Sequence, residues 1–234
     1  MKRYSRDDET SYSLGMSLTI EALKHRESFV EKIFLSSKAA KNRELDTLIE
    51  LCGRAGVPYV YDDRTIEKLS SKENCYCIGV FRKFKTPLSD GDHLILYGFN
   101  DLGELGTTIR SAVSFDITDI ILMGGDIDHF DPACVRSSMG SLFHCNVAQC
   151  ADLGSYRRAY PERKISPLLG HGGRSIEDLR IESPFTLMIS QGFCDLDAIF
   201  EDGFSILDGE SGDISLSIRS AVFLSQAYHM KRSR

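Results

Sequence analysis

The sequence predicts an α/β protein, because strand-like apolar runs alternate with segments whose apolar residues recur at helical spacing. In the second half of the chain we expect helices at 104–114 and 132–142 and a last helix from about 214, and strands at 93–99, 118–123, 145–149, 185–189 and 204–207. A short helix near 195–200 precedes the last of these strands. Helices that alternate with strands in this way connect the strands of a mostly parallel sheet.

The first half of the chain predicts a second, smaller α/β domain. We expect helices at 16–26 and from about Asn42, a helical turn at 65–69, and strands at 29–35, 57–61 and 75–81, with a frayed, polar segment at 1–14. The polar stretch 83–92 contains Pro87 and Gly91, which are typical of a linker. The sequence therefore predicts two domains, 1–88 and 89–234.

Composition predicts a globular protein of the cytoplasm. The 234 residues are 42% hydrophobic and 26% charged, which is ordinary for a soluble domain. No apolar run approaches the roughly 20 residues that span a bilayer, and the N-terminal segment lacks the apolar core of a secretion signal. The seven cysteines contain no Cys-x-x-Cys pair, so we expect free thiols and no metal site.

The net charge of −6 excludes a generic nucleic-acid binder, since phosphate contacts dominate that affinity. Any RNA contact must come from local basic patches, and the candidates are 82–85, which includes Arg82 and Lys83, and the tail 231–234. A solvated run of charges is an equal alternative for either patch.

One basic residue, Arg110, has a position that suggests chemistry. Asp101 to Phe115 forms a glycine-marked loop and a helix between two apolar runs, and helical spacing puts Leu105 and Ile109 on the inner face with Arg110 beside it. Parallel sheets bind ligands in the crevice at their strand ends, where an arginine can reach a phosphate or a hydroxyl. The alternative is a solvated surface arginine.

Three segments in order resemble the SpoU/TrmH branch of the SPOUT RNA methyltransferases. Asp101-x-x-Glu104-Leu-Gly-x-x-x-Arg110-Ser-Ala resembles the first motif of the family, and Val135-Arg-Ser-Ser-Met-Gly-Ser-Leu-Phe143 is similar to its Arg-Ala-Ser-Met-Gly-Ala-Leu-Phe segment. Near the end of the chain, Ser215-Leu-Ser-Ile218 is similar to Ser-Leu-Asn-Val. The first half resembles the ribosomal-protein-like α/β domain that binds RNA in many family members.

The resemblance implies a SPOUT-type sheet with a C-terminal trefoil knot, a homodimer, and transfer of a methyl group from S-adenosylmethionine to a ribose 2′-hydroxyl of tRNA or rRNA. Arg110, with Glu104, is the implied catalytic group, and Arg82, Lys83 and Arg136 are the candidates for RNA contacts. The implied cofactor-binding residues are Ile189, Ser190, Gln191, Gly192, Ile206, Leu207, Ser215, Leu216 and Ser217. Neither DNA nor a membrane is expected as a partner.

Several positions depart from the family pattern. Glu104 stands where the family has asparagine, Gln191 replaces a glutamate, and Ser217 replaces an asparagine. Ile189 occupies a glycine position and would point away from the cofactor pocket or narrow it. A pairing of Glu104 with Arg110 would quench the arginine. These departures leave open an alternative, a SPOUT-fold RNA-binding homodimer that has lost catalysis.

Overall fold

The computed structural model describes residues 2–70, 74–169, 173–191, 199–200, 202–206 and 214–232. These residues form two compact units. Unit 1 comprises residues 1–84 and 128–144, and unit 2 comprises residues 85–127 and 145–234. The first stretch of unit 1 ends at residue 84, four residues before the boundary expected at residue 88. Residues 128–144 also belong to unit 1, although they lie far along the chain.

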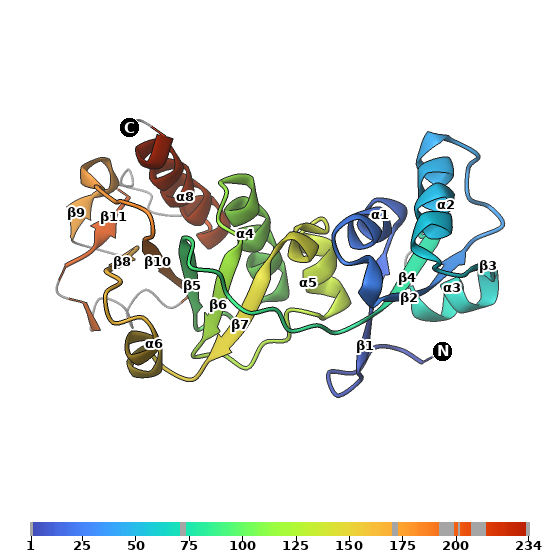
Figure 1. Cartoon of the computed structure of the whole chain (residues 1–234), viewed down its shortest axis with the longest axis horizontal. Helices are drawn as coiled ribbons and strands as arrows, with labels where there is room; N and C mark the ends of the chain where they lie inside the picture. Colours follow the sequence, from blue (N-terminus) through green and yellow to red (C-terminus); the bar gives the residue numbers. More distant parts are fainter. Residues whose placement is uncertain are drawn as a thin grey trace. The chain divides into compact units, whose positions relative to one another are not determined.

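Unit 1 contains a four-stranded mixed sheet in the order β1-β4-β2-β3, in which only β2 and β3 are parallel (Figure 1). The strands are β1 Thr10–Leu14, β2 Val30–Leu35, β3 Tyr59–Tyr61 and β4 Cys77–Arg82, and the helices are α1 Met16–His25, η1 Glu27–Phe29, α2 Arg43–Ala55 and α3 Asp63–Leu69. The predicted cap of α2 is confirmed, because the Asn42 side chain accepts a hydrogen bond from the Leu45 amide.

Strand β1 contradicts the expectation that residues 1–14 are frayed. Ser11, Tyr12 and Ser13 are buried, and the strand pairs with β4. Its small hydroxyls tolerate burial because they are hydrogen-bonded: Ser11 donates to the Phe130 carbonyl, and Ser13 Oγ lies 2.8 Å from Thr19 Oγ1. A strand whose core is built from satisfied serines lacks the apolar signal that sequence patterns detect.

The segment 128–144 completes the core of unit 1. It forms α5 Pro132–Ser137 and η2 Ser141–His144. Phe130 and Phe143 pack their rings against Phe81 and Phe84, with centroid separations from 4.9 to 6.5 Å. This four-membered set is the aromatic cluster of unit 1.

The helix predicted at 132–142 ends early, at Ser137. Met139 and Gly140 both adopt positive φ, which breaks the helix and leaves Met139 51% exposed. A Cβ on Gly140 would lie 3.0 Å from the Glu21 Cβ, so the turn needs glycine where it approaches α1. Leu142, by contrast, is fully buried.

Unit 2 contains a five-stranded sheet in the order β7-β6-β5-β10-β8, and every neighbouring pair is parallel. The strands are β5 His93–Tyr97, β6 Asp119–Met123, β7 Asn146–Cys150, β8 Ile165–Pro167 and β10 Thr186–Ser190. The helices are α4 Leu102–Ser114, α6 Leu153–Ala159, η3 Ile176–Asp178 and α8 Leu216–Arg232, and a small second sheet pairs β9 Arg174–Ser175 with β11 Phe204–Ser205. The mostly parallel α/β fold is thus confirmed, while α6 and β8 were not predicted.

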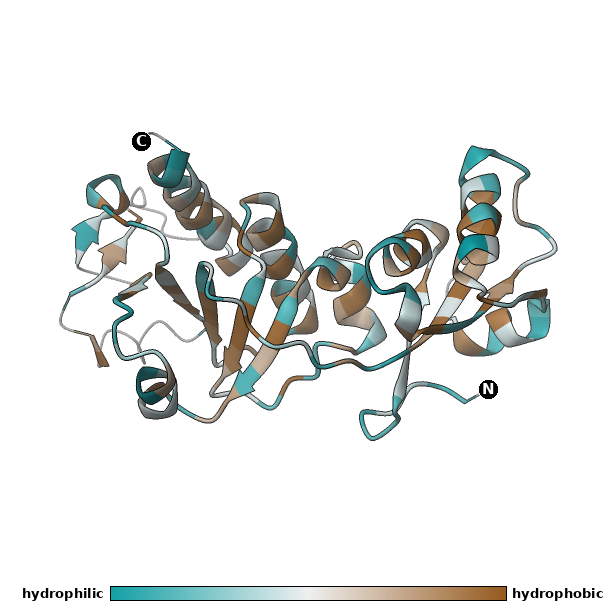
Figure 2. Cartoon of the chain, viewed as in Figure 1, coloured by the Kyte–Doolittle hydropathy of each residue, from teal (hydrophilic) through white to brown (hydrophobic). Residues whose placement is uncertain are grey.

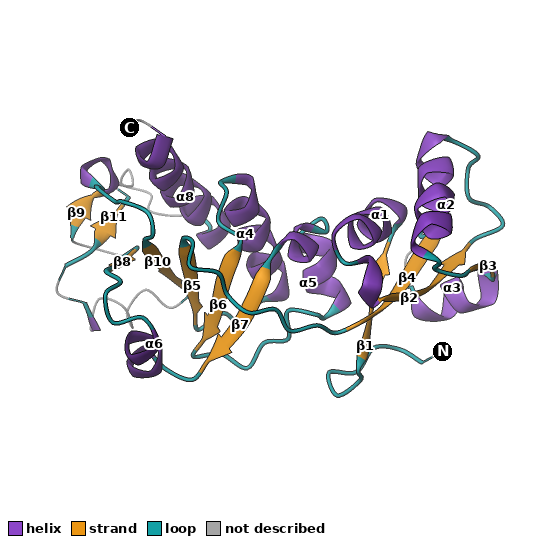
Figure 3. Ribbon diagram, in the orientation of Figure 1, coloured by secondary structure: helices purple, strands orange, loops and turns teal. Residues whose placement is uncertain are grey.

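The central strands of unit 2 are hydrophobic along their length (Figure 2). Ile95, Ile121 and Met188 stand in register on neighbouring strands and pack against Tyr156 of α6. On the other side of the sheet α8 packs against α4 (Figure 3). Burial on both faces explains why these strands are readable as continuous apolar runs.

Two predictions concern segments that the structure does not describe. The short helix near 195–200 falls mostly on residues 192–198, and the trefoil knot depends on the path through 192–198 and 207–213, all outside the described residues. Among the described helices, none has the length and apolarity required to cross a membrane.

Candidate functional site

Helix α4 fixes Arg110 at the surface of unit 2. The helix begins at the Asp101 cap, whose carboxylate accepts a 2.8 Å hydrogen bond from the Glu104 amide. Leu105 and Ile109 are fully buried and hold the inner face of α4 against the sheet. Arg110 is exposed, and no described residue forms an ion pair or hydrogen bond with its guanidinium group. A cation held by a buried helix face and left without a partner is available to a ligand.

Glu104 does not neutralise the positive charge of Arg110, since no ion pair joins the two side chains. The Glu104 side chain is half-buried, and its Oε2 atom is buried without a hydrogen-bond partner among the described residues. A buried carboxylate oxygen without a partner is costly to leave unsatisfied. The first turn of α4 therefore presents an acceptor for a hydroxyl or amine group.

Gln191 joins the carboxyl ends of β5 and β10. Its amide donates to the Tyr97 carbonyl at 3.1 Å, and its Oε1 accepts a 2.7 Å hydrogen bond from the Asn100 amide. This glutamine positions the loop that leads into α4. The sequence did not single out Asn100, and its place directly after the Gly98-Phe99 end of a strand is the signal that could have done so.

Ile189 and Ser190 are fully buried in β10. Ile189 pairs with Leu96 inside the sheet, so its side chain belongs to the core. The side chain of this isoleucine therefore packs within unit 2 and is not exposed. Gly192 and Leu207 lie outside the described residues, and Ile206 is half-buried after β11.

A groove of about 520 Å³ runs between α4, η3 and α8. It is lined by Thr107 and Ser111 on α4 and by Ser217 on α8, together with Ile176, Ile218, Ala221, Val222, Ser225 and Gln226. Arg110 lies on the same helix, one residue before Ser111 and three after Thr107, and is not itself among the residues that line the groove. The structure thus brings Ser217 near the segment that carries Arg110.

The other predicted residues at the start of α8 lie beside this groove. Ser215 is exposed, with its Oγ 3.2 Å from Ser217 Oγ, and Leu216 is half-buried. The start of α8 therefore carries small hydroxyl groups at the groove, whereas Ile189 and Ser190 are enclosed in the sheet.

The three predicted RNA-binding residues belong to unit 1 and differ in availability. Lys83 forms a 3.0 Å ion pair with Asp128 and also donates to the Arg6 carbonyl. Arg82 pairs with Glu31 at 3.4 Å but remains more than half exposed. Arg136, on α5, is exposed. The fold therefore engages Lys83 in contacts within unit 1, whereas Arg136 and much of Arg82 remain exposed at the surface.

At the amino ends of the strands, opposite to the ends that carry Gln191, the carboxylate of Asp119 has a structural role. The buried Asp119 carboxylate accepts hydrogen bonds from the Ser89 amide at 2.8 Å and from Asn146 Nδ2 at 3.0 Å. Burial acts to raise the pKa of Asp119, but hydrogen bonds from Ser89 and Asn146 outweigh it, so the pKa lies below its ordinary value.

Comparison with known proteins shows what this part of the chain resembles. Residues 92–190, which include α4 and β10, match the model of the SpoU rRNA methylase family. The Bacillus subtilis enzyme RlmP, a 23S rRNA (guanosine(2553)-2′-O)-methyltransferase, is 24% identical over 148 residues. That alignment covers 59% of this chain and 57% of the enzyme, so the chain spans little more than half the length of this relative.

Solved structures share the fold over nearly the whole chain. The SpoU methyltransferase AviRb from Streptomyces viridochromogenes, solved with AdoMet, superposes with a TM-score of 0.77 at 17% identity, covering 94% of this chain and 90% of its own. An AdoMet-bound rRNA methyltransferase from Sinorhizobium meliloti gives 0.76 at 19% identity, with coverages of 94% and 87%. The fold is therefore that of the SpoU-type methyltransferases. Residues 92–190 are, in addition, similar in sequence to the SpoU rRNA methylase family.

Proposed function

We propose that this protein is an S-adenosylmethionine-dependent RNA 2′-O-ribose methyltransferase. The observation that carries the proposal is the unpaired, exposed Arg110 on α4, inside the region that matches the family model. The ribose hydroxyl must give up its proton to a base to attack the methyl carbon, and a guanidinium group beside it lowers the cost of the negative charge that develops on the oxygen as the proton leaves. The same fork-shaped group can hold a neighbouring phosphate with two hydrogen bonds.

The residues present fit a ligand that carries hydroxyl groups. The Glu104 Oε2 atom is buried and lacks a described partner, so it can accept a hydrogen bond from such a hydroxyl. Ser215 and Ser217 add hydroxyls at the start of α8, and Gln191 orders the strand ends beside them. S-adenosylmethionine, the cofactor named for two of the solved neighbours, would supply the methyl group when bound.

The substrate in this proposal is tRNA or rRNA, and the RlmP resemblance favours rRNA as the first to test. Arg82 and Arg136 are the exposed cations of unit 1 that can reach phosphates. A cytoplasmic homodimer is part of the same proposal, because α8 exposes Ile218 by 56% and Val222 by 41% beside the groove, and a second copy would cover them.

Calorimetry with S-adenosylmethionine is the first test of the enzyme. Measurable binding followed by transfer of labelled methyl groups to rRNA or tRNA supports the proposal. The absence of heat at millimolar cofactor would overturn it and leave the RNA-binding homodimer without catalysis, which the departures at Glu104, Gln191 and Ser217 favour. RNA binding by gel shift, measured on the same preparation, distinguishes that second function from a loss of all binding.

A further inference from the structure

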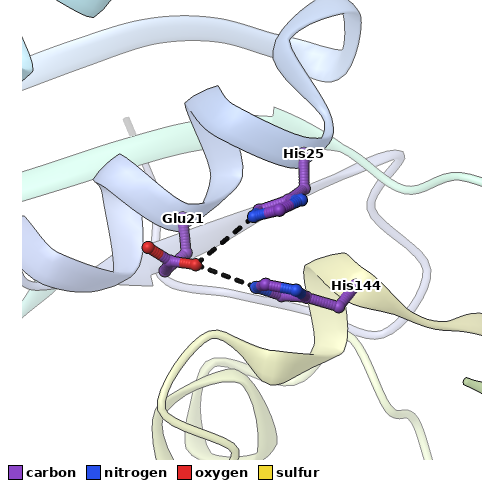
Figure 4. A group of neighbouring side chains, drawn as sticks. All are labelled: Glu21, His25 and His144. Carbon is purple, nitrogen blue, oxygen red and sulfur yellow. Dashed lines mark hydrogen bonds and ion pairs between the residues drawn. The ribbon is translucent and has the colours of Figure 1, made fainter. Parts of the chain in front are cut away.

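Three side chains from distant parts of the sequence meet on the surface of unit 1. Glu21 and His25 lie one helical turn apart on α1, and His144 comes from η2 in the segment 128–144 (Figure 4). Each offers one ligand atom, and these atoms lie within 4.8 Å of one another. In the described part of the chain this is the one group of histidine, cysteine and carboxylate residues with that geometry.

We propose that Glu21, His25 and His144 form a binding site for a divalent transition metal, with Zn²⁺ as its natural occupant. Two imidazole nitrogens and one carboxylate oxygen are a ligand set that Zn²⁺ accepts, with water in the fourth position. The residues are 27–39% exposed on their side chains, so water and an ion have access. Neither composition nor motif spacing predicts this site, because His144 lies 123 residues from Glu21.

The distances fit an ion after a small adjustment. Glu21 Oε2 lies 2.8 Å from His144 Nε2 and 3.6 Å from His25 Nε2. Tetrahedral ligands at zinc distances are separated by about 3.3 Å, a value between these two. To seat the ion, the His144 ring would move away from Glu21 Oε2 by about half an ångström, and the two imidazole rings would swing apart from their present 3.7 Å centroid separation.

The surroundings hold the ligands in place. Lys24 binds the other carboxylate oxygen of Glu21 at 3.1 Å, which leaves Oε2 facing the two rings. The rings of His25 and His144 stack, with centroids 3.7 Å apart. Gly140 allows the turn before His144 to approach α1. A bound ion would thus tie the segment that carries Arg136 to the first helix of unit 1.

The chain contains cysteines that also bind zinc, so the test must distinguish thiolate from imidazole ligands. We would titrate the metal-free full chain with Zn²⁺ by calorimetry and with Co²⁺ by absorption. Cobalt held by nitrogen and oxygen gives visible d–d bands without the near-ultraviolet thiolate band. We expect one such site in the wild type, and a rise in melting temperature on adding Zn²⁺.

The variants His25→Ala and His144→Ala should each weaken this site by at least about tenfold, whereas His229→Ala, which removes an exposed histidine of α8, should leave it unchanged. Two separate variants are used because one of them could fail to fold, which a melting curve in chelator would reveal. Equal Zn²⁺ affinity in wild type and both variants would overturn the proposal, as would a cobalt spectrum with only thiolate character or no binding.

Discussion

Unit 1 and unit 2 use their basic side chains differently. In unit 1, Lys83 is held in an ion pair with Asp128, and Arg82 is bonded to Glu31 and to the Ser28 carbonyl. In unit 2, Arg110 has no described partner although its helix is firmly anchored. Both patterns read alike in a sequence, as basic residues beside an apolar run. A cation marks a candidate site only where the fold leaves it unpaired.

The largest expected effect lies in unit 2. Arg110→Ala should lower the rate of RNA methylation by about 10²–10³-fold, because it removes a donor from the developing charge. Thermal stability should stay unchanged, since the side chain is exposed and forms no ion pair or hydrogen bond with a described residue. Single-turnover methylation with labelled cofactor measures the rate, and Arg64→Ala, which removes an exposed arginine of unit 1, is the matched control. Equal activity of Arg110→Ala and wild type would remove Arg110 from the proposed role.

A second test asks whether unit 1 depends on buried titratable groups. Burial lowers the pKa of His129 from 6.5 to about 4, and its Nδ1 atom is buried without a described partner. The folded chain keeps His129 neutral while the unfolded chain takes up a proton below pH 6.5. The unfolding free energy should therefore fall by about 3 kcal/mol as the pH drops from about 6.5 to about 4.

His129→Leu should remove this part of the pH dependence, as measured by urea unfolding at several pH values. His229→Gln, which changes an exposed histidine, should retain it. The same pH dependence in wild type and His129→Leu would contradict the assignment.

A third test sharpens the contrast between the two ends of the sheet in unit 2. Asp119, at the amino ends, is fully engaged by Ser89 and Asn146, so Asp119→Ala should destabilise the fold by about 2 kcal/mol. Because its folded pKa is depressed, its contribution is present above about pH 4 and is lost as the pH falls through the folded pKa.

Urea unfolding at neutral and acidic pH measures this contribution. Asp90→Asn, at an exposed position in the same loop region, serves as the control. A loss no larger than that of the control would show that this end of the sheet tolerates the missing carboxylate.

The smallest expected effect is on the free energy of unfolding, and it is measured by comparing two lysines that lie two residues apart. Lys83→Met should cost about 1 kcal/mol of unfolding free energy, because it leaves the half-buried Asp128 without its cation. Lys85→Met should be close to neutral for stability, since Lys85 is exposed. If this patch binds RNA, Lys85→Met should reduce the salt dependence of RNA binding by about one phosphate contact. A Lys85→Met variant that is less stable than the wild type would contradict the distinction between paired and unpaired cations.

The sequence predicted the elements that apolar burial dictates. Strands β5, β6 and β10 are buried on both faces, and their apolar runs are unbroken, so each was predicted to within a few residues. Strand β1 was missed because its buried positions are serines that the fold satisfies with hydrogen bonds. The end of the helix at Ser137 was missed because the turn at positive φ that exposes Met139 cannot be inferred from the apolarity of that residue.

The candidate site shows the same division. Spacing and resemblance placed Arg110 beside the inner face of a helix, which is where it lies. They could not show that Lys83 is paired, that Ile189 is buried in the sheet, or that Glu104 and Arg110 stay apart. Each of these depends on contacts between residues distant in the chain, as does the Glu21–His144 contact.

Because residues 128–144 belong to unit 1, they limit how the chain can be divided into fragments that fold. A fragment that stops after Phe84 would lack Phe130 and Phe143, half of the aromatic cluster, and would leave Phe81 with an open side. The complementary fragment, from Lys85 onward, would contain those two phenylalanines with their apolar side chains exposed to solvent. A single cut therefore separates neither unit, and an exchange of unit 1 with a protein of similar fold must replace two separate stretches at once.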